Sequence, residues 1–66
     1  MKVKINGQEK IFSGELSLKQ LMDELKLDSS KVAIERNLEI IPCSEHSITQ
    51  LNDGDNIEIV QFIGGG

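Results

Sequence analysis

The sequence predicts an α+β domain in which a mixed sheet of four to five strands packs on one helix. Three observations predict this class: an alternating stretch with an Asn-Gly turn near the start, one amphipathic helical stretch after it, and short apolar strands in the second half. Because each element has one apolar side, a sheet laid against a single helix buries all of them together.

The first expected element is a β-hairpin. Polar and apolar residues alternate over residues 2–5, and Asn6-Gly7 is a strong signal for a two-residue turn. Residues 9–13 can return as the second strand.

A single helix is expected next. Ser17 caps its start and Gln20 follows in a capping-box arrangement. Apolar residues then recur with the spacing of one helix face, at Leu18, Leu21, Met22 and Leu25. Polar turn-formers interrupt this spacing at residues 27–30, where we expect the helix to end.

A second hairpin is expected after the helix. Residues 32–36 form one strand, Asn37-Leu38 the turn, and residues 39–41 a short strand that ends at Pro42, because proline cannot donate to a ladder.

The segment after Pro42 is less clearly patterned. Residues 44–51 fit either a loop or one helical turn that Ile48 and Leu51 seat on the core. Residues 52–55 are a turn in which Gly54 supplies a positive φ.

The last strand is expected directly after this turn, from residue 56 to residue 63. Its alternation points Ile57 and Ile59 to the helix, and Val60 and Phe62 to the opposite face. A hairpin, a helix, a second hairpin and a last strand in this order are typical of the β-grasp, or ubiquitin-like, architecture. We therefore expect one β-grasp domain over residues 1–63 and a flexible glycine tail over residues 64–66.

Composition narrows the class of protein. The chain has 66 residues, one cysteine, one histidine and a formal net charge of −4. A domain of this size buries only about 60% of its unfolded surface, which leaves no room for an enzyme's cleft. One cysteine excludes an iron–sulfur electron carrier of this fold. The acidic balance argues against a nucleic-acid partner and suits a basic protein surface.

The chain also lacks the apolar runs of secreted and membrane proteins. Charges separate the apolar residues of its first stretch, and no later stretch approaches the ~18 apolar residues of a membrane span. We expect a cytoplasmic protein with no membrane partner, monomeric when free.

The chain ends in Gly64, Gly65 and Gly66. Residues without side chains cannot pack, so we expect a mobile tail whose chemical group is the Gly66 carboxylate. That carboxylate is ionised at neutral pH and is a poor electrophile, so acyl chemistry there must begin with activation, for example by ATP. Apolar residues beside the tail, at Val60, Phe62 and Ile63, are candidates for a partner-docking surface.

Other reactive side chains do not assemble into a site. No second cysteine or histidine completes a metal site or a nucleophile–base pair with Cys43 or His46. We expect Cys43 to be a loop thiol, with a role as a mixed thioester or acyl-disulfide partner in sulfur relay as the alternative. We expect His46 to be a surface or half-buried loop residue. The acidic pairs, Asp23-Glu24 and Asp53 with Asp55, are expected to be solvated, and the second pair to shape a turn.

Three stretches in this order resemble the ThiS family, the sulfur carriers of thiamine (thiazole) biosynthesis. They are residues 33–37 with 39–42, then Leu51 with residues 53–55, and residues 57–60 with 62–66. The sequence departs from the family at Cys43 and near His46, where the family often carries a basic and an aromatic residue. Those departures affect loop contacts, not the chemistry of the tail.

The resemblance implies a protein substrate, not an enzyme. The Gly66 carboxylate would attack ATP on an E1-like adenylating enzyme, and a sulfur donor carrying a persulfide would convert the acyl-adenylate to a thiocarboxylate. The thiocarboxylate would deliver sulfur to thiazole synthase. The chain would bind no cofactor, since its partner uses the ATP.

Two alternatives stay open from the residues alone. A molybdopterin-type sulfur carrier shares the fold and the Gly-Gly end, but residues 35–37 and 53–55 fit a thiazole carrier better. A ubiquitin-like modifier or binding module would use the same tail to form an isopeptide, or not use it chemically.

Overall fold

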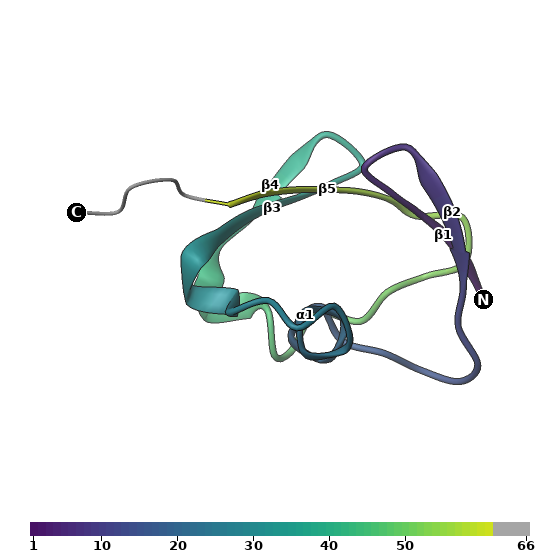
Figure 1. Cartoon of the computed structure of the whole chain (residues 1–66), viewed down its shortest axis with the longest axis horizontal. Coiled ribbons are helices and arrows are strands. Elements are labelled where there is room, and N and C mark those ends of the chain that lie inside the picture. Colours follow the sequence, from purple (N-terminus) through teal and green to yellow (C-terminus); the bar gives the residue numbers. More distant parts are fainter. Residues whose placement is uncertain (62–66) are drawn as a thin grey trace.

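The computed structural model describes residues 1–61, which form a five-stranded sheet over one α-helix (Figure 1). In chain order the elements are β1 (Lys2–Ile5), β2 (Gln8–Ile11), α1 (Leu18–Glu24), β3 (Val32–Arg36), β4 (Glu39–Ile41) and β5 (Asn56–Gln61), with 3₁₀ turns at Ser29–Lys31 and Cys43–Glu45. This architecture confirms the predicted α+β, β-grasp class. The expected boundary between domain and tail, after residue 63, lies outside the described residues.

The last strand of the described chain lies in the middle of the sheet, whose order is β2-β1-β5-β3-β4. β5 runs parallel to β1, with Ile57 opposite Ile5, and antiparallel to β3, with Ile59 opposite Ile34. The two hairpins therefore lie on either side of β5, and the sheet is mixed, as predicted.

Both predicted hairpins have two-residue turns with left-handed backbone angles. Asn6 and Gly7 have φ values of 49° and 85°, and Asn37 and Leu38 have φ values of 50° and 70°. Two positive φ values in succession give the turn whose twist matches that of the flanking strands. β2 ends at Ile11, before the expected residue 13, although the Phe12 amide still donates to the Met1 carbonyl over 2.9 Å.

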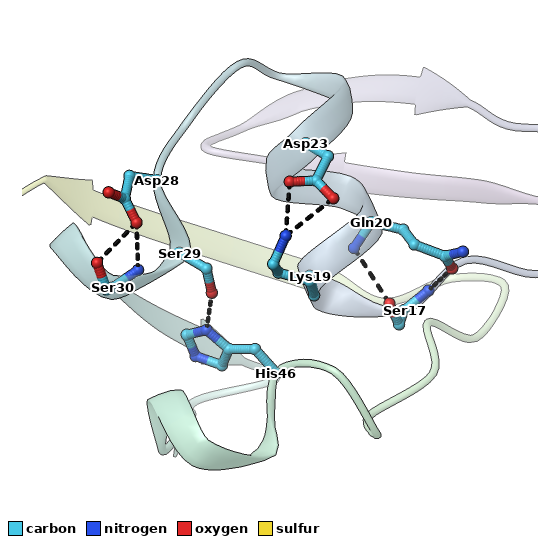
Figure 2. Close-up of polar contacts among 8 residues, drawn as sticks. All are labelled: Ser17, Lys19, Gln20, Asp23, Asp28, Ser29, Ser30 and His46. Carbon is cyan, nitrogen blue, oxygen red and sulfur yellow. Dashed lines mark hydrogen bonds and ion pairs between the residues drawn. The ribbon is translucent and has the colours of Figure 1, made fainter.

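The helix starts as predicted and ends earlier. The Ser17 hydroxyl accepts from the Gln20 amide and the Gln20 side chain accepts from the Ser17 amide, which closes the capping box (Figure 2). At the other end Lys26 has a φ of 59°, and the Leu27 amide donates back to the Met22 carbonyl over 2.8 Å. This left-handed cap ends the helix at Glu24 instead of at residues 27–30.

The core lies between α1 and one face of the sheet, and the opposite sheet face is not covered by any element of residues 1–61 (Figure 1). Its buried members are Val3, Ile5, Leu18, Leu21, Met22, Val32, Ile34, Ile41, Leu51 and Ile57. Each such side chain contributes about 1.5–3 kcal/mol when fully buried. No helix within the described chain is long and apolar enough to cross a membrane.

One predicted core contact is wrong. Leu51 is buried as expected, but Ile48 is 73% exposed. The amides of Ile48 and Thr49 both donate to the Glu45 carbonyl, and this tight turn directs the Ile48 side chain to solvent. Residues 46–51 therefore form a loop in which one apolar side chain, Leu51, faces the core.

Candidate functional site

Side chains from both hairpin turns hold β5, the strand that leads to the predicted tail. The Asn6 side chain accepts from the Ile59 amide over 2.8 Å and donates to the Ile59 carbonyl over 3.2 Å. The Asn37 side chain accepts from the Asn56 amide over 2.9 Å. β5 is therefore bonded to both hairpin turns, at its first residue and at Ile59.

Asp55 anchors the beginning of the same strand and corrects a prediction. Its side chain is 6% exposed and not solvated as expected. It accepts from the Asn52 amide over 2.8 Å and from the Asn37 side chain over 3.1 Å, and it lies 3.7 Å from the Arg36 guanidinium. These three partners explain how a carboxylate can be buried here.

The predicted turn at residues 53–55 is confirmed. Gly54 has a φ of 87°, and its amide donates to the Lys2 carbonyl over 2.7 Å. The Asp53 carboxylate accepts from the Lys2 amide over 2.7 Å. The two acidic residues therefore shape the backbone, as the turn chemistry predicted, and Asp53 ties the turn to β1.

The open face of the sheet carries an apolar hollow over β4, β3 and β5. Val60 is 61% exposed, as its position in the strand predicted, and Ile40 of β4 is 71% exposed. The residues that line the hollow, with a volume of ≈ 290 Å³, are Ala33, Ile34, Glu35, Ile40, Glu58 and Val60. Val60 is thus part of a larger surface, and its role in docking stays a prediction.

Sequence reasoning missed the contributions of Ala33 and Ile40 to this surface. Ala33 stands opposite Val60, and Ile40 stands opposite Glu35. The available signal was the alternation in residues 39–41, where inward Ile41 leaves Ile40 to point outward. The other predicted site residues, Phe62, Ile63, Gly64, Gly65 and Gly66, lie outside the described residues.

His46 is fully buried, which corrects the expectation of a surface or half-buried residue. It is 2% exposed, and its Nδ1 lies 2.5 Å from the Ser29 hydroxyl (Figure 2). Its Nε2 lies 3.0 Å from the Ile41 carbonyl. A carbonyl can only accept, so Nε2 carries a proton, and in the neutral ring Nδ1 then accepts from the Ser29 hydroxyl. The ring bridges the Ser29–Lys31 turn to β4 and has a structural role.

The remaining candidates behave as expected of surface groups. Cys43 is exposed, and its thiol donates only weakly to the Ser29 carbonyl over 3.6 Å. Asp23 forms an exposed pair with Lys19, 2.8 Å apart. The Ser30 hydroxyl and amide donate to Asp28 and hold the pKa of that carboxyl below its usual value. Within residues 1–61, no cluster of three or more potential ligands could hold a metal ion.

A comparison with known families decides the family. The model of the ThiS family matches residues 3–66, which is nearly the whole chain. The chain belongs to the ThiS family. The resemblance predicted from three short stretches of sequence is therefore confirmed.

Relatives and solved structures agree with this assignment. A protein of Paramagnetospirillum magneticum named thiazole synthase is 54% identical over all 66 residues, and the chain spans about a fifth of it, 20% of its length. The sulfur carrier protein ThiS of Bacillus subtilis is 40% identical over 50 residues, which are 76% of each chain.

The fold also has a close structural counterpart. The crystal structure of the thiamine biosynthesis protein ThiS from Geobacter metallireducens matches with a TM-score of 0.84, at 30% identity and over 100% of both chains. The β-grasp class deduced from the order of the elements is thus the fold of a solved member of the family.

Proposed function

We propose that this chain is a sulfur carrier of thiamine biosynthesis that carries sulfur as a thiocarboxylate on Gly66. The observation that carries the proposal is the family match over residues 3–66, because the match includes the glycine end as well as the domain. The relative in Bacillus subtilis is named a sulfur carrier protein, which supports the same role here.

The proposed loading has three chemical steps. First, a Gly66 carboxylate oxygen attacks the α-phosphate of ATP on an E1-like adenylating enzyme, and pyrophosphate leaves. Second, the terminal sulfur of a donor persulfide attacks the acyl carbon, and AMP leaves. A further thiol then cleaves the sulfur–sulfur bond of the acyl disulfide, becomes oxidised to a disulfide, and releases the thiocarboxylate.

The chain itself supplies position and not catalysis in this scheme. β5 is bonded to both hairpin turns, so the folded domain can present residue 66 at a defined place on a partner. Holding the carboxylate in line with the phosphate lowers the entropic part of the barrier, and the enclosing partner keeps water from the adenylate. ATP is bound and used by the activating enzyme, and the proposed reactions take place in the cytoplasm.

The proposed acceptor of the sulfur is thiazole synthase. Support comes from the protein of Paramagnetospirillum magneticum that bears this name, since a segment of it is 54% identical to this chain. A carrier and its acceptor joined in one polypeptide would meet at high effective concentration. The separate chain would meet its acceptor through docking.

The proposal can be tested by ATP–pyrophosphate exchange on the activating enzyme. We expect exchange to require the chain, and to stop when Gly66 is deleted or when a residue is added after it. Neither change alters residues 1–61, so the thermal unfolding of the domain should be unaffected. Exchange that persists without Gly66 would contradict the proposal, as would a stable amide bond between Gly66 and a lysine, the product of a protein modifier.

A further inference from the structure

Two glutamates face each other on the open side of the sheet. Glu35 of β3 stands directly opposite Glu58 of β5 in the antiparallel register. Side chains in directly opposed positions have Cβ atoms about 4.5–5.5 Å apart, and like charges at that separation destabilise a sheet. The pair therefore lowers the stability of the isolated domain.

No basic residue of the described chain forms an ion pair with either glutamate. The ion pairs within residues 1–61 join Lys2 to Glu9, Lys19 to Asp23, and Arg36 to Asp55. Lys4 is the nearest lysine in the register, and it stands opposite Asn56, diagonal to Glu58. Arg36 points to the other side of the sheet, where it donates to the Gln50 carbonyl over 2.7 Å.

The glutamate pair lies next to apolar surface. Both residues line the hollow over β4, β3 and β5, together with Ala33, Ile40 and Val60. Ala33 stands opposite Val60, two residues along each strand from the glutamate pair and on the same face of the sheet. The short side chain of Ala33 leaves space in the hollow at this position. A charged edge beside an apolar floor is the composition of a protein-docking surface, in which a cation is recognised at the rim of an apolar contact.

We propose that Glu35 and Glu58 together receive a basic side chain of the activating enzyme, while a neighbouring apolar side chain of that enzyme fills the hollow over Ala33. This inference rests on the proposed function, because that function supplies the partner. A guanidinium suits the site best, since its planar fork can donate to two carboxylates at once. The same cation relieves the repulsion between the two glutamates. This relief adds to the favourable free energy of binding.

The test measures affinity and stability on the same variants, Glu35→Gln, Glu58→Gln and the double variant. Each change keeps the size of the side chain and removes one charge. We expect the dissociation constant for the activating enzyme to rise about threefold to tenfold for each single variant at low salt, with a smaller rise at high salt where the charges are screened. The same variants should unfold at an equal or higher temperature than the parent chain, because the repulsion is gone.

Glu24→Gln is the matched control, because Glu24 is exposed at the end of α1, on the side of the sheet away from the hollow. It should leave the dissociation constant unchanged. If Glu24→Gln weakens binding as much as Glu58→Gln does, net charge alone explains the effect and the inference is wrong. The inference is also wrong if the double variant binds like the parent chain, or if the variants lose affinity only in proportion to a lowered unfolding temperature.

The proposed function and this inference fail in different ways. Exchange that requires the parent chain, with unchanged binding of the double variant, removes the glutamate site and leaves the sulfur carrier standing. If the parent chain neither supports exchange nor binds the activating enzyme, the proposed function is wrong. The proposal that the glutamates contact that enzyme is then wrong as well.

Discussion

The two hairpins reach the same geometry with different residues. Each turn begins with an asparagine near φ 50° whose side chain bonds to β5. The second turn residue is Gly7 in the first hairpin, where a positive φ is easy, and Leu38 in the second, where it is not. Leu38 is also 84% exposed, so burial within the described chain does not offset its strain.

The two turns differ in how well their residues suit left-handed backbone angles. The β1–β2 turn is built for the fold alone, since Asn6 and Gly7 both favour left-handed angles. The β3–β4 turn keeps the asparagine that holds β5, yet it carries a strained apolar residue, and the next strand exposes Ile40 on the open face. The strain at Leu38 therefore lowers the local stability of the second hairpin. One exposed apolar residue of this hairpin, Ile40, lines the hollow described above.

The largest effect is expected from a substitution that breaks the contact between the second turn and β5. Asn37→Ala removes the bonds to the Asn56 amide and to the buried Asp55 carboxylate, and leaves alanine at a positive φ. We expect the free energy of unfolding to fall by about 3 kcal/mol, measured by urea denaturation. Asn52→Ala is the control, because Asn52 contacts Asp55 through its backbone amide. An equal loss in the control would contradict the account.

Breaking the contact of the first turn should have a smaller effect. Asn6→Ala removes two bonds to Ile59 but leaves no buried charge without a partner, so we expect a loss of about 2 kcal/mol. Asn6→Asp keeps the acceptor for the Ile59 amide and loses the donor to the Ile59 carbonyl. Its free energy of unfolding should lie between those of the parent chain and Asn6→Ala. A loss for Asn6→Ala larger than for Asn37→Ala would reverse the comparison.

Giving the first turn the residue of the second isolates the strain. A Cβ atom added at Gly7 meets no atom within 4 Å, so the main expected effect of Gly7→Leu is on the backbone preference. We expect it to lower the free energy of unfolding by about 1–2 kcal/mol in thermal or urea unfolding. A neutral result would mean that the strain assigned to Leu38 is also absent.

The converse exchange should stabilise the domain slightly. Leu38→Gly relieves the left-handed strain and removes a side chain that is 84% exposed. Glycine also gains freedom in the unfolded chain, so we expect a net rise of only about 0.5 kcal/mol in the free energy of unfolding. Destabilisation instead would show that Leu38 packs on the domain in solution.

The elements that could be predicted from the sequence are those with local signals. Alternation over residues 2–5, the Asn-Gly turn and the capping box at Ser17 each depend on neighbours in the chain, and the structure confirms them. The helix end was predicted too late because Lys26 adopts a left-handed cap that glycine usually occupies. Residue type gives no warning of that.

The misses arise where distant residues decide the environment. His46 follows polar residues in sequence, and its burial comes from Ser29 and Ile41, which the fold brings to both ring nitrogens. Asp55 is buried because Asn37 and Arg36 of the second hairpin contact it. In the candidate site Val60 could be predicted from its strand alone, whereas the hollow and the glutamate pair depend on which strands lie side by side.

The measurement that tests the central claim most directly is mass spectrometry of the intact chain after incubation with ATP, the activating enzyme and a persulfide donor. We expect a mass gain equal to the exchange of one oxygen for sulfur, and fragmentation should place it at Gly66. Omission of ATP should abolish the gain. An unchanged mass with all components present and active, or sulfur found on Cys43 instead of Gly66, would contradict the account.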